Sequence, residues 1–477
     1  MLKRIFLAFF LCGSFCLFGQ QKIVSFANSL KTNSTSIKDM YPVVNENTGE
    51  VAVFISDAKS VYGYRFNNRF EKIDELIVED KRREFKNFLG SQTSENGDYR
   101  IFLSNAKADK FLTINFSFTN KSVTYNEFAL LRNYESYVQA FTFKNEFYLL
   151  SAATNVDKVY VYTFKEQGAP KRNDLDVSGI KLLNKFDNPG QITQFISPKK
   201  RPPVFYENTP TALEQATKQH KLFITKDEVI LTIDENRSVT QFLTLDLNAM
   251  KATRTAFEKP YPNIKRIRKR SNSFVNGDHL FSIGVLKDAF TLQVRDLKQN
   301  VVLKEHTARR KEPIAFKNSP IIVLAGGRAK PRQTERTREL IDLLYMNSAG
   351  LSVLKTNDRY LISIGAYDIT DPEQVPFTLD LETDRFGMLN YWYSESTRID
   401  GLFDSNFNHV PKDSVVNAFE KIHSYIDPNW NAYKFTEPFG IVKNKTREQL
   451  TLFKYQDYFV LIELVDKSTL AFVKFTN

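Results

Sequence analysis

The chain has 477 residues, of which 42% are hydrophobic and 13% aromatic, and its formal net charge is +11. A disordered chain would be poorer in apolar and aromatic residues, so the composition indicates a large folded core. The positive charge can attract polyanions or anionic surfaces over a Debye length of about 10 Å.

Residues 1–19 have the pattern of a secretory signal peptide. Lys3 and Arg4 form the charged start, an apolar run extends from Ile5 to Phe18, and a cleavage site lies before Gln20. The apolar run is short for a membrane span, and polar chain follows it. We therefore predict an exported protein without a transmembrane span, located in the periplasm, on the outer envelope or outside the cell.

Two alternatives to cleavage remain at this end of the chain. The first is a retained N-terminal anchor. The second is lipidation at Cys12 or Cys16, although Leu11 and Phe15 are larger than the residue that usually precedes a lipidated cysteine. Both cysteines lie inside the predicted signal peptide, so the mature chain would contain neither a disulfide nor a thiolate ligand.

A repeated strand pattern is clearest between Gly97 and Leu131. A turn at Gly97-Asp98 precedes the apolar run Tyr99–Leu103. Apolar and polar residues then alternate from Leu112 to Phe118, which sends successive side chains to opposite faces of a strand. A further turn at Asn120-Lys121 leads into a third strand, so the stretch predicts an antiparallel meander.

Similar units recur along the chain at a regular spacing. The units that start at Gly49, Gly97 and Asn145 are 48 residues apart, and those at Asp227 and Gly277 are 50 apart. The 82 residues between Asn145 and Asp227 leave room for one degenerate unit or an insertion. Two further units begin at Asp358 and Asp457.

A period near 50 with several strands per unit is typical of a β-propeller. One small sheet cannot bury both of its faces, whereas sheets packed radially can. We predict an all-β protein in which residues 20–477 form a single propeller of about seven or eight blades with short helical insertions. Strands from Lys22–Phe26 and 470–475 would close the ring in one blade. The competing interpretation is two stacked β-sandwiches, for which the regular spacing is unexpected.

The repeats resemble those of β-propeller proteins in general, over most of the mature chain. The chain has neither the Trp-Asp pair of WD40 repeats nor the doubled glycine of kelch repeats at the strand ends. The resemblance therefore implies a fold and no functional residue.

Three segments depart from the repeat, near 198–220, 326–345 and 404–430. The first contains a short helix predicted at 209–216, the second a basic loop from Gly326 to Arg338, and the third a helix at 414–426 with apolar residues at helical spacing. Insertions on one ring face are where propellers usually bind their partners.

Motifs of several enzyme classes are missing from the sequence. The five histidines do not form an H-E-x-x-H pattern, no G-x-S-x-G nucleophile motif occurs, and Gly326-Gly327 is not followed by the residues of a phosphate loop. We therefore predict no metal and no cofactor. Acidic residues gather in one loop-rich stretch that could supply a carboxylate pair for glycoside hydrolysis: Asp368, Asp371, Glu373, Asp380, Glu382 and Asp384.

Basic runs are more pronounced than any acidic pair. The candidate binding residues are Lys265, Arg266, Arg268, Lys269, Arg270, Arg328 and Arg332. They suit a polyanionic glycan or an envelope protein, and an exported protein rarely meets a nucleic acid. The alternative is a solvated strand edge, because lysine and arginine protect edges from aggregation.

These observations favour an exported, non-catalytic binding or scaffold protein of the cell envelope that uses one loop face of a propeller. The first alternative is a propeller-type hydrolase that acts on a polysaccharide or peptide through loop carboxylates such as Asp368 and Asp371. The second is a surface-anchored subunit of a larger assembly.

Overall fold

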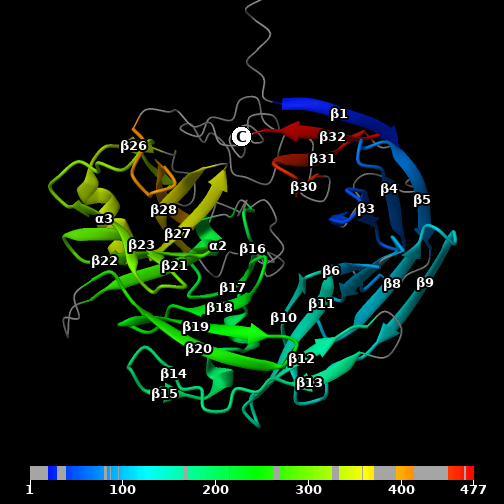
Figure 1. The fold of residues 1–477 in the computed structure, drawn as a ribbon, viewed down its shortest axis with the longest axis horizontal. Helices are drawn as coiled ribbons and strands as arrows, with labels where there is room; N and C mark the ends of the chain where they lie inside the picture. The colour runs from blue at the N-terminus through cyan, green and yellow to red at the C-terminus, as the bar shows by residue number, and fades with distance from the viewer. Residues whose placement is uncertain are drawn as a thin grey trace, which may run out of the picture.

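The protein folds into antiparallel sheets that follow one another around a central axis (Figure 1). The computed structural model describes residues 20–29, 39–79, 83–85, 87–94, 96–165, 170–209, 211, 213–261, 268–324, 332–356, 358–369, 394–411, 450–466 and 469–476. Within these ranges there are seven sheets of four or five strands and one two-stranded sheet. The predicted signal peptide and the predicted helix at 414–426 lie outside the described residues.

The first three sheets in the chain are regular four-stranded meanders. They comprise β2 (Asp39–Val44), β3 (Val51–Ser56), β4 (Val61–Phe66) and β5 (Lys72–Val78); β6 (Asn87–Thr93), β7 (Tyr99–Ser104), β8 (Phe111–Ser117) and β9 (Ser122–Phe128); and β10 (Ser136–Phe143), β11 (Glu146–Ala153), β12 (Lys158–Thr163) and β13 (Lys171–Asp174). Most residues of the second and third strands are buried, whereas β9 is largely exposed. This gradient is expected for a sheet whose last strand lies at the periphery.

Two of the next three sheets carry a fifth strand in addition to this plan. One contains β16 (Val204–Tyr206), β17 (His220–Ile224), β18 (Val229–Ile233), β19 (Val239–Asp246) and β20 (Lys251–Glu258), with β16 parallel to β17. The next contains β21 (Arg270–Asn276), β22 (His279–Val285), β23 (Ala289–Asp296) and β24 (Val302–Arg309). The third has the order β26 (Arg332–Thr334), β25 (Ile321–Leu324), β29 (Ser394–Phe403), β28 (Arg359–Ile369) and β27 (Ser348–Thr356).

Strands from both ends of the described chain form the seventh sheet. Its order is β1 (Gln20–Ala27), β32 (Thr469–Phe475), β31 (Tyr458–Asp466) and β30 (Leu450–Tyr455). β1 pairs with β32 in an antiparallel register that joins Ser25 to Ala471. The predicted pairing of terminal strands is therefore present, and the fold is an all-β propeller and not a pair of sandwiches. The number of blades stays a prediction.

The regular repeat arises from the turn between the inner strands of each sheet. Gly49, Gly97, Asn145 and Gly277 all have positive φ, between +56° and +78°, a conformation that glycine and asparagine tolerate best. Each repeat defined from the sequence therefore begins at a turn, one strand after the sheet itself begins. The sequence pattern missed the strand before each turn.

The core is divided into layers between neighbouring sheets. One cluster lies between the β30–β32 and β2–β5 sheets and includes Phe66, Phe70 and Phe472. Others fill the spaces between β2–β5 and β6–β9, between β6–β9 and β10–β13, and between β10–β13 and β16–β20. A larger cluster joins β16–β20, β21–β24 and the β25–β29 sheet. The five sheets from β2–β5 to β21–β24 thus have an apolar layer on each face, as radial packing requires.

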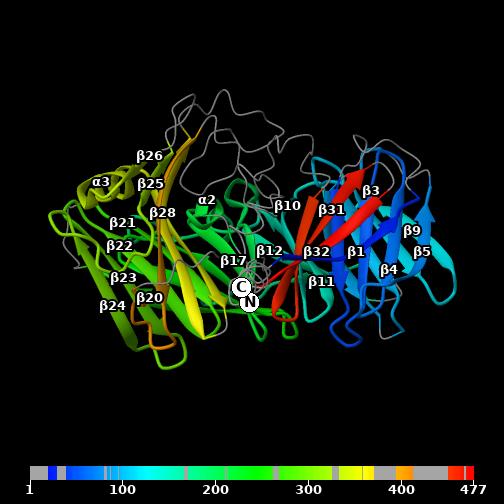
Figure 2. The same cartoon turned by 90° about the horizontal axis from the view of Figure 1, so that it is seen from above.

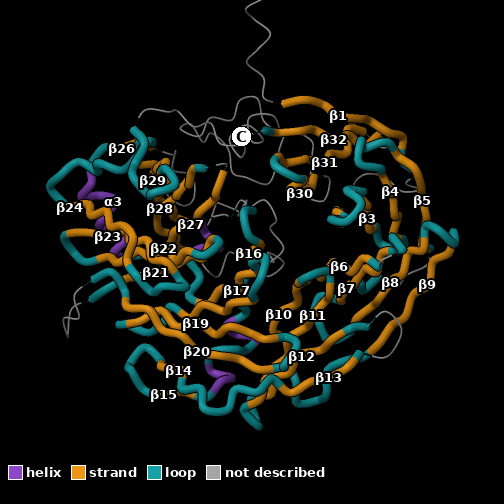
Figure 3. The backbone as a smooth tube through the Cα atoms, viewed as in Figure 1, coloured by secondary structure: helices purple, strands orange, loops and turns teal. Residues whose placement is uncertain are grey.

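The long gap in the repeat contains no further four-stranded sheet among the described residues between β13 and β16. It contains the two-stranded sheet of β14 (Leu182–Leu183) and β15 (Pro189–Gly190), the 3-10 helices η2 (Ile192–Gln194) and η3 (Pro198–Lys200), and β16. The helix predicted at 209–216 is shorter than expected, since α2 covers only Leu213–Ala216. Figure 3 shows how few helices interrupt the strands.

The predicted basic loop from Gly326 to Arg338 is not a loop at its C-terminal end. Arg332 lies on β26, and Arg338 lies in α3 (Thr337–Met346), a helix at the periphery of the ring beside the β21–β24 sheet (Figure 2). The apolar residues Leu340, Ile341 and Leu344 are fully buried. Their i, i+1 and i+4 spacing places them on one helix face, and this pattern is what the charge-based interpretation missed.

Candidate functional site: a cleft between two sheets

Three of the basic residues predicted from the sequence, Arg268, Arg270 and Arg332, lie at the two ends of α3. Arg268 and Arg270 donate hydrogen bonds to the Met346 carbonyl over 3.0 and 3.3 Å, and Arg270 Nε donates to the Tyr345 carbonyl over 3.4 Å. Arg332 forms an ion pair with Glu339 in the first turn. The ends of a ten-residue helix are about 15 Å apart, so these arginines do not form one compact cluster.

Arg268 and Arg270 have an evident structural role. The last carbonyls of a helix lack partners within the helix, and cations stabilise its negative end. Lys269 lies near the Tyr261 ring, with 4.7 Å between Nζ and the ring centroid. Lys265, Arg266 and Arg328 lie outside the described residues. A polyanion site built on this set stays a prediction.

The acidic stretch is described only at its start. Asp368 lies near the end of β28, opposite Glu395 of β29 in the strand register. Asp371, Glu373, Asp380, Glu382 and Asp384 lie outside the described residues. Within the described ranges, no three His, Cys, Asp or Glu side chains are placed to hold a metal ion together.

A cleft of about 610 Å³ lies among the described residues. It lies where the β16–β20 and β21–β24 sheets meet, and Lys355 of β27 and Tyr360 of β28 also line it. Its rim is made of turns: Thr225–Glu228 between β17 and β18, Gly277 and Asp278 between β21 and β22, Lys298 after β23, and Lys355 at the end of β27. Hereafter "the cleft" refers to this hollow.

The turns on the rim are held by their own hydrogen bonds. Thr225 N donates to the Glu228 carbonyl over 3.0 Å, and Thr225 Oγ1 accepts from Glu228 N over 3.0 Å. Gly277 has a φ of +56°, which a side chain would strain. Leu297 N donates to the Asp278 carbonyl over 2.9 Å. The rim is therefore preformed, and the contacts it offers to a ligand come mainly from side chains.

Charges of both signs face each other across the cleft. Four carboxylates and three lysines line it: Glu207, Asp227, Glu228, Asp278, Lys226, Lys298 and Lys355. Lys298 Nζ lies 2.9 Å from Asp278 Oδ2, and this hydrogen bond, together with the charge of Asp278 and, more weakly, that of Asp227, raises the Lys298 pKa. Glu207 Oε2 accepts a hydrogen bond from Lys226 N over 3.1 Å. The rim is thus polar but nearly neutral overall.

His279 lies half-buried in the cleft wall. Its ring packs on Phe407 and Tyr360 at centroid distances of 5.0 and 6.2 Å. Burial lowers the pKa of His279 below its ordinary value. The imidazole is therefore neutral at pH 7 and offers one donor and one acceptor. Beside it the floor is apolar and formed by Ile230, Phe242, Phe257, Leu297 and Tyr360.

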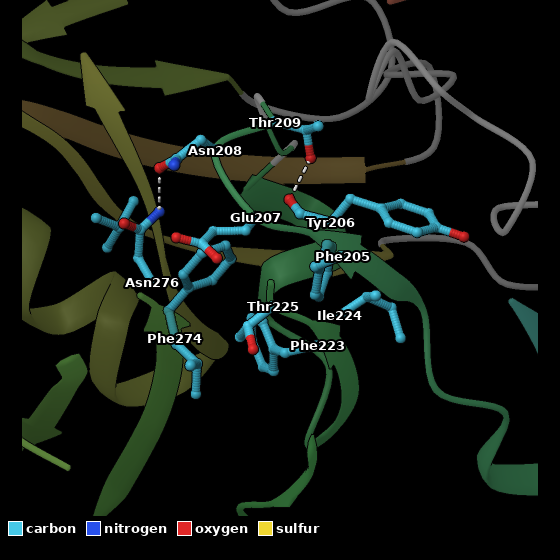
Figure 4. A pocket seen from close by; sticks show the side chains of 12 residues that line it. Phe205, Tyr206, Glu207, Asn208, Thr209, Phe223, Ile224, Thr225, Phe274 and Asn276 are labelled. Carbon is cyan, nitrogen blue, oxygen red and sulfur yellow. Dashed lines mark hydrogen bonds between the residues drawn. The ribbon is translucent and has the colours of Figure 1, made fainter. Parts of the chain in front are cut away.

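A second, much smaller cavity adjoins the cleft, and Figure 4 shows the residues that line it. Both hollows share Glu207, Asn208, Thr225 and Asn276 as lining residues. Asn276 Nδ2 donates to Asn208 Oδ1 over 3.2 Å, and the Tyr206 ring points away from the cavity in Figure 4. The inner cavity measures about 10 Å³, roughly the space of one water, so a larger ligand has room only in the cleft.

A buried polar network fixes the two sheets that flank the cleft. Lys221 and Asp234 are fully buried and lie 2.9 Å apart. Lys221 Nζ also donates to Asn272 Oδ1 of β21 over 2.7 Å, and Ser273 N donates to Asp234 over 3.1 Å. Burial would raise the Asp234 pKa, but the charges of Lys221 and Lys259 lower it to about 2. These contacts join β17 and Asp234, just after β18, to β21, toward the ends of these strands that lie away from the cleft.

The cleft residues were not identified from the sequence. Asp227 and Gly277 were recognised there only as repeat starts, and Asn276, His279 and Lys298 received no binding role. The available signal was their position, because repeat turns of neighbouring sheets meet on one face. The sequence does not reveal which turns meet around open space.

Comparisons with known proteins bear on the fold and not on the function. No family model matches the chain, and a search of curated proteins found no match. Among solved structures, the chain is similar to the β-propeller domain of Nup133 from Vanderwaltozyma polyspora (10% identity, 96% of this chain and 100% of that chain, TM-score 0.31). It is also similar to the Dos1 propeller (8% identity, 92% of this chain and 77% of that chain, TM-score 0.31). A third similar structure is AztD from Citrobacter koseri (9% identity, 56% of this chain and 58% of that chain, TM-score 0.26).

One further property concerns membranes. Within the described ranges, no helix combines the length and the apolar character that a membrane crossing needs.

Proposed function

We propose that this protein is an exported, non-catalytic binding or scaffold protein of the cell envelope, which holds its partner at the turn side of the propeller. The signal-like residues 1–19 support export. The proposed partner is a glycan or an envelope protein.

The cleft is the observation that carries this proposal. Its volume of about 610 Å³ falls within the range of about 300–1,000 Å³ that is usual for ligand sites. Three sheets supply its polar groups, and hydrogen bonds of Lys221 and Asp234 to Asn272 and Ser273 connect two of those sheets. A preformed hollow of this kind favours recognition, because little freedom is lost when a ligand binds.

The test is binding by the purified mature chain, residues 20–477. We expect the immobilised chain to retain a glycan or protein from a native envelope extract, and to release that material chemically unchanged. Bound material should be compared by mass spectrometry before and after prolonged incubation.

Two results would contradict the proposal. One is the failure of any envelope component to bind. The other is turnover of a polysaccharide or peptide that disappears in Asp368→Ala or Asp371→Ala, which would favour the hydrolase alternative. The matched control is Asp457→Ala, which also removes a carboxylate but lies in the turn between β30 and β31. It should leave any such turnover unchanged.

A further inference from the structure

We infer that the cleft between the β16–β20 and β21–β24 sheets binds a neutral oligosaccharide segment. This inference rests on the proposed binding function and deepens it by naming the ligand class. It follows from the charge, the hydrogen-bonding groups and the shape of the cleft.

The charges exclude a strongly anionic or cationic ligand at this place. The four carboxylates and three lysines nearly cancel, and Asp278 and Lys298 form an ion pair over 2.9 Å. His279 adds no charge at pH 7, because burial lowers its pKa. A polyanion would face Glu207, Asp227 and Glu228, and the repulsion would oppose its binding.

The polar groups suit a ligand rich in hydroxyls. Carboxylates accept hydrogen bonds, lysines donate them, and the side chains of Asn208, Thr244 and Thr255 do both. A sugar hydroxyl likewise donates and accepts, so adjacent hydroxyls can satisfy neighbouring groups of opposite character. Phe242, Phe257 and Tyr360 are almost fully buried beneath the floor, so recognition rests mainly on the polar groups.

The backbone of the rim argues against an extended peptide. Peptides that add to a sheet need a strand edge with unpaired main-chain groups. Here β21 and β22 pair up to Asn276 and His279, and β17 and β18 pair up to Ile224 and Val229. The main-chain groups of Thr225 and Leu297 are engaged in turns. Recognition in the cleft therefore depends on side chains.

The cleft also has the reach for more than one sugar ring. It extends from Glu207, after β16, to Lys355 at the β27–β28 turn, and its wall includes Thr255 on the outer strand β20. A chain-like ligand lying across three sheets would contact all of these groups together.

The test compares a variant that fills the cleft with a matched one that does not. Thr255→Trp places a bulky side chain on the wall at an exposed strand position, which a β-strand tolerates. Thr124→Trp makes the same change on β9, at an exposed position on an outer strand of a distant sheet (Figure 1). Near-identical thermal unfolding of both variants would show that each is folded.

The probes are short malto-, cello-, laminari- and chito-oligosaccharides, a sulfated oligosaccharide, and a library of unstructured peptides, each titrated by calorimetry. We expect a neutral oligosaccharide to bind, with an affinity that falls by about tenfold or more in Thr255→Trp and stays unchanged in Thr124→Trp. Binding should change little with salt, because no net charge is neutralised.

Other outcomes overturn the inference. These are binding of the sulfated probe or of peptides alone, an oligosaccharide affinity that Thr255→Trp leaves intact, or no binding of any neutral oligosaccharide. Envelope binding that persists in Thr255→Trp would overturn this inference while leaving the proposed function standing. Failure of the unmodified chain to bind any envelope component would contradict the proposed function itself.

Discussion

His220 is a buried titratable side chain at the start of β17. Its Nε2 atom lies 3.6 Å from Glu235 Oε2, which also accepts a hydrogen bond from Lys200 over 2.6 Å. Burial, followed by the positive charges of Lys200 and Lys221, lowers the His220 pKa from 6.5 to about 3. The folded protein therefore keeps this imidazole neutral in mildly acidic solution, where an unfolded chain would protonate it.

This difference predicts a loss of stability at acidic pH. Between pH 6.5 and pH 3 the unfolded state binds more protons at His220 than the folded state, so the free energy of unfolding falls as the pH decreases through this window. In the unmodified protein, His220 should lower the free energy of unfolding by roughly 2–3 kcal/mol between pH 7 and pH 4. We expect His220→Gln to remove this loss. Urea unfolding at pH 7, 5 and 4 measures it.

The control variant is His409→Gln. His409 is only half-buried, follows β29 in the chain and pairs with Phe403, so this change should leave the His220 part of the pH dependence in place. Its pKa is also lowered by burial, but the structure places it outside the β16–β20 sheet. A His220→Gln variant with the same pH slope as the unmodified protein would contradict the assignment. The low pKa of Asp234, about 2, does not obscure the test, because its own contribution is lost only below about pH 3.8.

At this scale the sequence predicted turn residues better than binding residues. Gly97 and Asn145 mark turns because the required φ is local, and local chemistry is visible in a sequence. The roles of Arg268 and Arg270 depend on where α3 ends in space, about 75 residues later in the chain. The same limit hid Asn276 and His279, whose environment is assembled from several sheets.

Adjacent sheets need a small residue wherever a large side chain of one sheet lies against the backbone of the next. Phe147 of β11 stacks on Phe102 of β7 with 3.8 Å between ring centroids and 10° between ring planes. Gly90 of β6 leaves space for the Phe147 ring, because a Cβ at that position would lie 2.7 Å from Cδ2. The glycine thus permits this aromatic pair between two sheets.

Gly90→Ala is therefore expected to destabilise the protein by about 1–3 kcal/mol, since the stacked ring cannot retreat without losing its own contacts. Thermal or urea unfolding measures the effect. Asn126→Ala, on the exposed strand β9 of the same sheet, should change the free energy of unfolding by less than about 0.5 kcal/mol. Equal stability of the two variants would contradict the close packing described here.

The elements were predictable to the extent that their patterns are local. Strands with alternating or continuous apolar residues, such as β8 and β31, stand out in the sequence. The first strand of each sheet was missed because strands such as β6, with Gly90 and Ser91, have a weak pattern. α3 was missed because its buried stripe of Leu340, Ile341 and Leu344 occurs in a segment with a high density of arginine.

At the scale of the whole molecule, one sheet is built from both ends of the described chain. β1 pairs with β32, and Phe26 packs on Phe66 with 4.8 Å between centroids. Tyr455 OH donates to the Gly49 carbonyl over 2.8 Å, which connects this sheet to the β2–β5 sheet. Contacts of such long sequence separation cost much chain entropy, so the apolar contacts of β1 must offset it.

Deletion of residues 20–27 tests this arrangement. We expect the shortened chain to unfold at a lower temperature, because β32 loses its outer neighbour and Phe66 loses a ring contact. Adding the free peptide of sequence QQKIVSFA should restore part of the loss, whereas the same peptide with aspartate in place of Phe26 should not. An unchanged unfolding temperature after the deletion would contradict the role of β1.

The regular period of 48–50 residues made the ring predictable, because it is a global signal that survives weak individual strands. The insertion between β13 and β17 and the cleft were not predictable. They are departures from the repeat, and a periodic pattern contains no information about where its exceptions meet.

The most direct test of the account is hydrogen–deuterium exchange of the mature chain with and without the envelope component that it retains. We predict slower exchange in the turns Thr225–Glu228 and Gly277–His279, which line the cleft. The corresponding turn at Lys144-Asn145 in the β10–β13 sheet should be unaffected. Protection confined to other surfaces, or no protection at all, would contradict the claim that the cleft is the binding site of this propeller.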